Sequence, residues 1–339
     1  MSKTVVGFML VDAPHSALNN AGADAGDRTD NIVRVKAIRR GKKAYPYVSG
    51  QALRYWWRDT LAERCGWNLS PIEREKKIAF TSANPIDYAD DDVFGYMRAL
   101  KAKEGGTVTR ISPLKNSPLI SIIGQITTQD FGVMARHEGN PVPYEHEFYS
   151  TVLKGIFSID LDSLGVFYSA EKTGYKNMYP KLEKIAEEQG LSYEENSKKW
   201  KMSDDVRTKR AQDVIKVLPY LQGGAKLTSH LTDVSPKFIV LAAIDGGNHI
   251  FMNIAKEEEG KAVIDVEALK EVINEYKDSL LTDVYMGRRK GFMDELEEPL
   301  GKLTGENDNI HVETIKEAVD HFSDEIPELI KHESIKNSD

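Results

Sequence analysis

Eight basic residues lie close together in the first part of the chain and could bind a polyanion. They fall within residues 34–58, a window of 25 residues that contains no Asp or Glu. They are Arg34, Lys36, Arg39, Arg40, Lys42, Lys43, Arg54 and Arg58. Such a block is the electrostatic footprint expected for a phosphate-bearing partner, provided that the fold gathers it on one surface. The alternative is a solvated loop followed by a charged helix face.

A helix predicted at residues 50–64 positions part of this charge. Ser49 is a typical N-cap residue, whose hydroxyl accepts an early helical N–H. One arc of the helix faces the core according to its 3.6-residue period; it holds Leu53, Trp56, Trp57, Thr60 and Leu61. Gln51, Arg54 and Arg58 share another arc, which begins where free N–H groups already favour an anion. Two arginines suit phosphate because each can donate two parallel hydrogen bonds. Pairing with acidic residues of the same helix is the alternative role.

Other residue sets could support catalysis. Asp24, Asp27 and Asp30 lie in a Gly/Asn-rich loop, where they could bind a divalent ion or simply form turns. His146 stands between two glutamates, a triplet that could bind a metal but is more typical of a surface. His15 could act as the general base of a metal-independent ribonuclease. The sequence has no Walker phosphate loop, no dinucleotide-binding glycine fingerprint and no HExxH motif.

Composition limits the class of protein. The chain has 339 residues, 40% of them hydrophobic, with 45 Lys+Arg against 53 Asp+Glu and a net charge of −8. This is typical of a globular chain with about two domains. The single cysteine, Cys65, excludes a disulfide framework and indicates a reducing, cytoplasmic compartment. The longest apolar run, residues 5–11, is far too short to span a membrane.

The negative charge is concentrated at the C-terminal end. Residues 294–339 contain fourteen Asp/Glu and four Lys, a net of −10, so the rest of the chain carries −8 − (−10) = +2. We expect this segment to be an acidic helical tail that lies away from any bound polyanion, and therefore to be dispensable for binding one.

Strands and helices alternate irregularly along the chain, which favours an α+β fold over a doubly wound sheet. Residues 124–149 mix aromatic and charged side chains, which predicts a protruding hairpin or loop. We predict strands at 5–11, 32–38, 44–48, 151–157, 164–168 and 237–244, and helices at 50–64, 181–218 and 266–280.

Several motifs together resemble the CRISPR backbone subunits of the RAMP superfamily, most closely the DevR branch of the Cas seven family in type I-B interference (Cascade) complexes. The resemblance covers about residues 4–290. The motifs are P-H-S-A-L-N-N at 14–20, N-I-V-R-V-K at 31–36, V-S-G-Q-A-L-R at 48–54, D-V-F-G at 92–95 and L-Q-G-G-A-K at 221–226.

The resemblance implies an α+β fold built on an RRM-like (ferredoxin-like) antiparallel sheet, the palm, with a thumb and helical finger insertions. The expected boundaries are 1–66, 150–178 and 211–293 for a discontinuous palm, 67–106 and 179–210 for two helical insertions, 107–149 for the thumb and 294–339 for the acidic helical tail.

The resemblance also implies a role in antiviral defence. Such subunits form a helical filament along a guide RNA (crRNA), which they bind without catalysis and without a cofactor or metal, while the guide pairs with target DNA in an R-loop. The implied partners are further copies of this chain, a large PAM-reading subunit, a guide-end-capping subunit, a repeat-processing ribonuclease and a recruited helicase-nuclease, with no membrane. Residues implied to contact RNA are Arg34, Lys36, Ser49, Gln51, Arg54, Arg58, Lys226 and Arg288; Phe131, Val133 and Met134 would displace a base at the thumb.

Two enzymatic alternatives stay open within the same superfamily: a repeat-processing ribonuclease that uses His15, and a subunit that cleaves target RNA. Related type III backbone subunits cleave target RNA with a loop aspartate, and Asp30 lies in the corresponding loop. The S-G-Q-A-L-R sequence at 49–54 favours the type I assignment.

Overall fold

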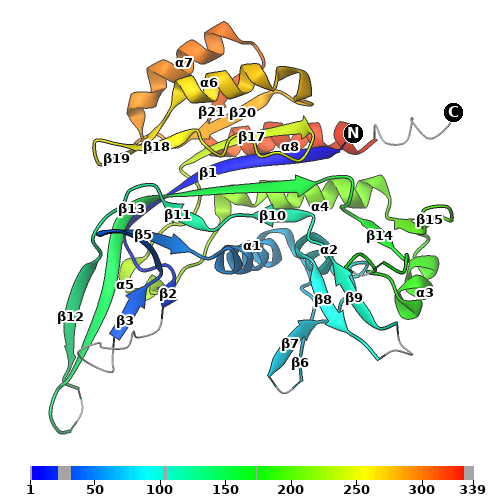
Figure 1. The fold of residues 1–339 in the computed structure, drawn as a ribbon, viewed down its shortest axis with the longest axis horizontal. Helices are drawn as coiled ribbons and strands as arrows, with labels where there is room; N and C mark the ends of the chain where they lie inside the picture. Colours follow the sequence, from blue (N-terminus) through cyan, green and yellow to red (C-terminus); the bar gives the residue numbers. More distant parts are fainter. Residues whose placement is uncertain are drawn as a thin grey trace.

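One mixed sheet organises the structure. The computed structural model describes residues 2–21, 32–75, 77–101, 105–136, 138–172 and 174–331. Its main path has the strand order β21-β20-β17-β1-β13-β11-β5-β4 (Figure 1). In that order the strands span Ile310–Glu313, Val284–Arg288, Phe238–Asp245, Lys3–Ser16, Val142–Asp160, Leu119–Ser121, Lys43–Val48 and Ala37–Arg40. Neighbours on this path are antiparallel except β20 and β21, which are parallel.

A β–α–β–β–α–β unit forms the centre of this sheet. In chain order it consists of β1, α1 (Gly50–Cys65), β11, β13, α4 (Asp204–Lys216) and β17, and its strands lie in the order β17-β1-β13-β11. The two helices contact each other, and the indole N–H of Trp57 donates to the carbonyl of Val214 at 3.0 Å. All five residues predicted to face the core from α1 are buried, so that prediction is confirmed.

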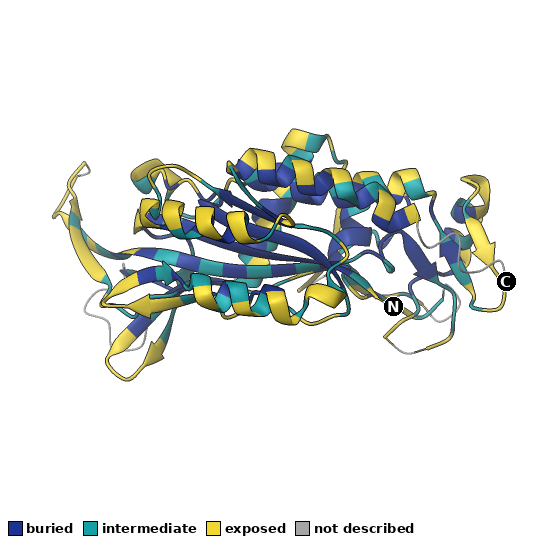
Figure 2. Ribbon diagram, turned by 90° about the horizontal axis from the view of Figure 1, so that it is seen from above, coloured by how far each residue is buried: buried dark blue, intermediate teal, exposed yellow. Residues whose placement is uncertain are grey.

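Both faces of β1 are covered, which explains its unbroken apolar sequence. Val5, Met9 and Val11 face a core formed with α1, α4 and α8 (Ile315–Lys331). The alternate residues Phe8 and Leu10 face a second core formed with α6 (Val266–Glu275) and α7 (Glu297–Glu306). Figure 2 shows buried residues along the sheet and the inner sides of these helices, with exposed residues on the hairpins at both ends.

A long hairpin projects from the sheet at the lower left of Figure 1. It is formed by β12 (Thr128–Met134) and the first part of β13, paired from Thr128–Phe148 to Met134–Val142. Two short strands run beside its base, β3 (Ile32–Val35) against β13 and β2 (Asn20–Ala21) against β3. The predicted protrusion at 124–149 is confirmed, and we name the paired strands 128–148 the thumb hairpin.

The segment expected to precede the thumb tip belongs elsewhere. Within 107–149, β9 (Thr107–Arg110) pairs with β8 (Tyr96–Ala99), and β10 (Leu114–Asn116) pairs with β13 in the main sheet, as does β11. Pro113 and Pro118 flank β10 and limit it to three residues, because proline cannot donate to a strand ladder.

The two segments expected to be helical differ: residues 67–106 hold more strand than helix, whereas residues 179–210 hold more helix than strand. Residues 67–106 hold one six-residue helix, α2 (Ala89–Phe94), beside the hairpin of β6 (Ile72–Glu75) and β7 (Ile78–Thr81). Residues 179–210 hold α3 (Pro180–Glu188) and the start of α4, separated by the paired strands β15 (Ser192–Glu194) and β16 (Lys199–Lys201). Strand β16 also pairs with β14 (Val166–Tyr168). The Lys- and Glu-rich composition of both segments suits exposed strands as well as helices, and a small separate core with buried Phe167, Met178 and Trp200 holds them together.

The acidic C-terminal segment is part of the fold, so its expectation as a dispensable tail is wrong. After a short hairpin of β18 (Ala255–Glu258) and β19 (Lys261–Ile264), the chain adds α6, β20, α7, β21 and α8 in turn. Phe322 and Ile326 of α8 are fully buried against the sheet. Its acidic residues lie on the outer side, a pattern that charge counting alone cannot distinguish from a tail.

The remaining elements are a four-residue helix, α5 (Leu227–His230), and 3-10 turns at Leu218–Tyr220, Lys277–Ser279 and Asp294–Leu296. Within the described ranges, no helix is long and apolar enough to cross a bilayer.

Candidate nucleic-acid interface

A basic groove of about 570 Å³ opens at the start of α1. We call it the α1 groove. Its walls come from the first turns of α1, the end of α2 and the segment before and within β10. The lining residues are Ser49, Gly50, Gln51, Arg54, Arg58, Phe94, Gly95, Ser112, Leu114, Lys115 and Asn116. Three of these described residues are cations and none is acidic, so the groove favours an anion.

The helix start adds to this charge. Ser49 caps α1 as predicted, since its hydroxyl accepts the N–H of Ala52 at 3.3 Å. The first turn of α1 carries no acidic residue that would offset the positive end of the helix dipole. Gln51 is exposed in this turn, so its amide can contact a ligand in the α1 groove.

Arg54 is bonded within the protein, and its predicted phosphate contact stays a prediction. Its guanidinium donates to the carbonyls of Leu114, at 2.9 Å, and Phe94, and to the side chains of Asn116 at 3.2 Å and Ser112 at 3.0 Å. Burial, together with the nearby charge of Arg58, lowers the pKa of Arg54 to about 10. These hydrogen bonds link α1 to α2 and to the segment around β10. Because all four acceptors are uncharged and the guanidinium stays protonated near pH 7, the positive charge of Arg54 in the groove is not neutralised.

Arg58 remains available to a ligand. Its guanidinium lies 4.2 Å from the centre of the Phe94 ring, and no hydrogen-bond partner is found for it in the described part of the chain. Burial lowers its pKa, while the charges of Asp90 and Asp91 behind it oppose that change. The aromatic ring therefore holds the arginine through a cation–π contact and leaves its N–H groups free to donate.

Lys36, Ser49 and Lys226 converge on one short segment, residues 18–19. The carbonyl of Asn19 accepts the N–H of Lys36 at 2.9 Å, and its side chain accepts the N–H of Ser49 at 2.9 Å. The N–H of Ala225 donates to Leu18 at 3.0 Å. No side-chain partner is found for either lysine among the described residues.

The glycines before Lys226 permit this convergence. Gly223 has φ of 150°, and a Cβ there would come within 2.3 Å of the Trp56 ring. The loop can therefore lie directly on the buried stripe of α1 only if residue 223 has no side chain.

Two predicted RNA contacts are neutralised by carboxylates. Arg34 pairs with the buried Glu147 of β13 at 3.1 Å, and the same carboxylate accepts the N–H of Val35. Arg288 pairs with Asp294 and with Glu297 at 3.3 Å, and it lies on β20, beyond β1 and β17 from the groove side of the sheet. In this structure Arg34 fastens β3 to the thumb hairpin and Arg288 fastens the acidic segment to β20, and their RNA contacts stay predictions.

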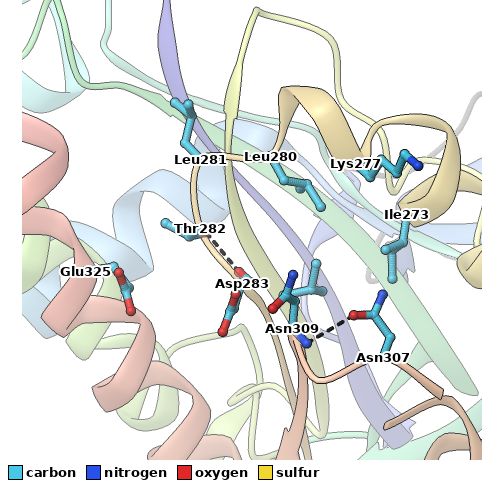
Figure 3. Close-up of a pocket in the computed structure, with 10 residues that line it drawn as sticks. Ile273, Lys277, Leu280, Leu281, Thr282, Asp283, Asn307, Asn309 and Glu325 are labelled. Carbon is cyan, nitrogen blue, oxygen red and sulfur yellow. Dashed lines mark hydrogen bonds between the residues drawn. The ribbon is translucent and has the colours of Figure 1, made fainter. Parts of the chain in front are cut away.

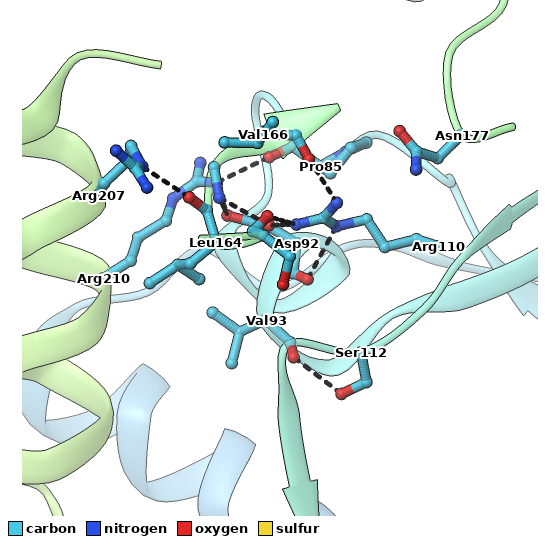
Figure 4. A network of polar contacts seen from close by, with 12 residues as sticks. Pro85, Asp92, Val93, Arg110, Ser112, Leu164, Val166, Asn177, Arg207 and Arg210 are labelled. Atoms are coloured by element: carbon cyan, nitrogen blue, oxygen red, sulfur yellow. Dashed lines mark hydrogen bonds and ion pairs between the residues drawn. The ribbon is translucent and has the colours of Figure 1, made fainter. Parts of the chain in front are cut away.

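A buried ion network stands behind the α1 groove (Figure 4). The Asp92 carboxylate of α2 pairs with Arg110 and, at 2.5 Å, with Arg210 of α4, and it accepts the N–H of Gly165 at 3.1 Å. All three charged side chains are buried. The network fixes α2, whose last residue, Phe94, bonds Arg54. The D-V-F-G motif at 92–95 carries part of the family resemblance, and nothing in its sequence signals this structural role.

Gly95 completes this corner. Its φ is 69°, and a Cβ would lie 2.4 Å from the carbonyl of Arg110. Only glycine lets the chain leave α2 so close to the segment that carries Lys115. Lys115 itself was missed in the sequence because it stands alone between two prolines, outside the basic window; it is exposed, without a described ion-pair partner.

The three predicted thumb residues are exposed, by 64% for Phe131, 51% for Val133 and 59% for Met134. Alternation along β12 places Phe131 and Val133 on one face and Met134 on the other. The ring of Tyr144 lies over Gly132 on the Met134 side. The trio therefore forms two surfaces, of which the Phe131–Val133 surface is the larger.

Other candidates do not join this site. Asp24, Asp27 and Asp30 fall outside the described residues. Among those that are described, no three His, Cys, Asp or Glu side chains gather as a metal site requires, and His146 instead lies 3.3 Å from Asp130. A further hollow beside Asp283, Glu325 and Asn309 (Figure 3) has acidic and amide walls, which disfavour phosphate.

Comparison with known proteins identifies the same class as the motifs. Residues 11–262 match the family described as "CRISPR-associated negative auto-regulator DevR/Csa2". Among solved structures, a chain of a "CRISPR RNA-guided surveillance complex, pre-nicking" is 12% identical with a TM-score of 0.52, covering 86% of this chain and 94% of that one. A chain of a "CRISPR RNA-guided surveillance complex" is also 12% identical, with a TM-score of 0.48, covering 84% and 87%. Comparison with curated proteins gives no match.

Proposed function

Since the chain belongs to the CRISPR-associated DevR/Csa2 family, we propose that it is a backbone subunit of a type I CRISPR RNA-guided surveillance complex and that its α1 groove binds the sugar-phosphate backbone of the guide RNA. The observation that carries this proposal is the composition of the groove. It holds the start of a helix, the cations Arg58 and Lys115, and Arg54, whose hydrogen-bond acceptors are all uncharged, and it has no carboxylate among its described lining residues. Contacts of this kind bind RNA without reading its sequence.

The fold supports an RRM-like palm. The strand order β17-β1-β13-β11 with α1 and α4 on one face is the order of a ferredoxin-like β–α–β–β–α–β unit. In the proposed filament, copies of this palm stack along one guide, whose free bases pair with target DNA. The other subunits of the complex join this filament at its ends and along its length.

The thumb hairpin is proposed to displace one guide base per copy. Phe131 and Val133 form an exposed apolar surface on a two-stranded projection. An apolar side chain inserted between stacked bases replaces one base–base contact at a cost of a few kcal/mol.

The proposed role is binding without cleavage. Guanidinium, ammonium and amide groups line the α1 groove, and protonated arginine and lysine cannot act as a general base near pH 7. Cleavage of target RNA through Asp30 is the alternative. Regularly spaced Mg²⁺-dependent cuts that disappear in Asp30→Ala would establish it.

Salt-dependent RNA binding tests the groove. Fluorescence anisotropy with single-stranded RNA of two unrelated sequences should show that Lys115→Ala lowers the slope of log K against log[salt] by about 0.7, one single-strand phosphate, for both sequences. Lys184→Ala, an exposed lysine on α3, is the matched control and should leave the slope unchanged. An unchanged slope in Lys115→Ala would reject the groove as the RNA site.

The thumb is tested separately. With 2-aminopurine in the guide, base displacement raises fluorescence, and Phe131→Ala with Val133→Ala should remove that rise while RNA affinity stays within about twofold. Met134→Ala, on the opposite face, is the control. Equal loss in the double variant and in Met134→Ala would mean that the hairpin contributes by general contact instead of by a defined wedge.

A further inference from the structure

A second basic hollow lies on the face of the sheet opposite α1. On β13, Leu153 and Phe157 face the α1 core, so the alternate residue Lys154 faces the other side. Helices α6 and α7 cover β1, β17 and β20 on that side. Toward β11, β5 and β4 the sheet is instead bordered by the hairpin β18–β19, and a hollow of about 260 Å³ remains between them.

The hollow combines an apolar floor with cations. Ile38, Ile120 and Ile122 form the floor. Arg40 and Lys154 stand at its sides, and the Arg40 guanidinium lies 5.4 Å from the centre of the Tyr45 ring. We call these residues the edge site because β4 is the last strand of the sheet path.

The charges of the edge site are only partly balanced. Lys256 pairs with Asp265 at 2.7 Å, and Lys43 pairs at 2.9 Å with Glu257, which also lines the hollow. Among the described residues, the one hydrogen-bond partner found for the Lys154 ammonium is the carbonyl of Met252, at 3.1 Å. Partial burial lowers the pKa of Lys154. An anion beside this ammonium would offset the loss of its hydration.

The positive charge continues along the edge of the sheet. Arg39, Arg40 and Lys42 are exposed at the β4–β5 turn, with no carboxylate partner in the parts of the chain described. These three cations of the basic window lie at the opposite end of β5 from Ser49 and the α1 groove. At about 3.3 Å per residue, the six residues of β5 separate the two places by roughly 20 Å.

We propose that the edge site binds a second segment of single-stranded nucleic acid, distinct from the strand in the α1 groove. Its phosphates contact Arg40, Lys154 and the β4–β5 turn, and a base lies on the isoleucine floor beside Tyr45. Sequence-tolerant single-strand sites combine an apolar or aromatic platform with a track of cations in this way. An acidic protein surface could pair with these cations, but it would place polar groups against the apolar isoleucine floor, which disfavours it as the partner. The inference goes beyond the proposed function, since it does not depend on what the α1 groove holds.

A two-strand binding experiment tests the edge site. The protein is saturated with an unlabelled guide RNA that lacks adenine and cannot pair with thymine, and fluorescein-labelled oligo-dT of about 12 nucleotides is then titrated in. We expect a second saturable rise in anisotropy. Arg40→Gln with Lys154→Met should weaken oligo-dT binding about tenfold at 0.15 M salt and lower its salt slope by about 1.4, two phosphate contacts.

The controls separate this site from the α1 groove. Lys115→Ala should weaken guide binding but leave oligo-dT affinity within about twofold, and Lys184→Ala should change neither. The methionine keeps the aliphatic stem of Lys154, and unchanged circular dichroism melting shows that the variant is folded. The proposal is overturned if oligo-dT affinity ignores Arg40 and Lys154, if it is lost in Lys115→Ala, or if sedimentation shows that the same double variant abolishes self-association instead.

Discussion

Replacing Asp92 should destabilise the protein more than any single change on its surface. Its carboxylate has no exposed area and is the counter-ion for Arg110 and Arg210, which are 4% and 7% exposed. Asp92→Ala leaves two buried guanidinium groups without a counter-charge, and breaking a buried pair in this way costs about 3–5 kcal/mol. Asp92→Asn keeps an acceptor oxygen and loses the charge, so we expect about 1.5–3 kcal/mol, the contribution of a hydrogen bond to a charged group.

Urea denaturation followed by tryptophan fluorescence measures this loss directly. The double variant Asp92→Ala with Arg210→Ala should lose less than the sum of the single variants, because each single change strands the other charge. RNA affinity should fall with stability, since α2 carries Phe94, whose carbonyl bonds Arg54. A loss below about 1 kcal/mol for Asp92→Ala would refute the reasoning, because it would mean that the remaining carbonyl contacts of both arginines suffice.

Three further changes have defined outcomes. Burial lowers the pKa of His249 below its usual 6.5, so on acidification His249 takes up a proton in the unfolded chain before it does so in the folded one. The free energy of unfolding should therefore fall as pH drops below about 6.5. In urea titrations at several pH values, His249→Gln should flatten that fall. Deleting residues 314–339 removes six large buried side chains of α8, whose burial contributes about 9–18 kcal/mol. Because this is as large as a typical total stability, the truncated chain should be unfolded by circular dichroism, and a folded truncation would restore the tail interpretation. Gly95→Ala should cost about 1–3 kcal/mol in chemical denaturation because of its positive φ and the nearby Arg110 carbonyl, and an unchanged midpoint would contradict the close approach.

Local signals in the sequence predicted the elements that pack against the sheet. The helix at 50–64, its cap at Ser49 and its buried stripe follow from one period and one capping residue, and they are confirmed. The strand predicted at 237–244 is observed as β17, with seven of its eight residues buried. The family prediction is likewise confirmed by the match over residues 11–262.

Long-range pairing decided the rest. Whether Arg34 is free depends on Glu147, more than one hundred residues away, and whether Arg288 is free depends on how the chain turns after β20. Arg54 is bonded to carbonyl groups, which every sequence has and which carry no signal of their own. Local charge counts could therefore locate the basic region but could not separate its bonded cations from its free ones.

The continuity of β13 gives the molecule a mechanical property. Nineteen residues at about 3.3 Å each make it roughly 60 Å long, with its last part clamped between β1 and β11 and its first part free except for β12 and β3. β13 therefore behaves like a beam held at one end, because it runs as one continuous strand from the thumb hairpin into the central sheet. The pairing of this held part with β1 is irregular at one place, where the register shifts between Ala13 and Ser16, beside Tyr149 and Thr151. A force applied at Phe131 would therefore bend β13 and be transmitted to the central strands of the same copy.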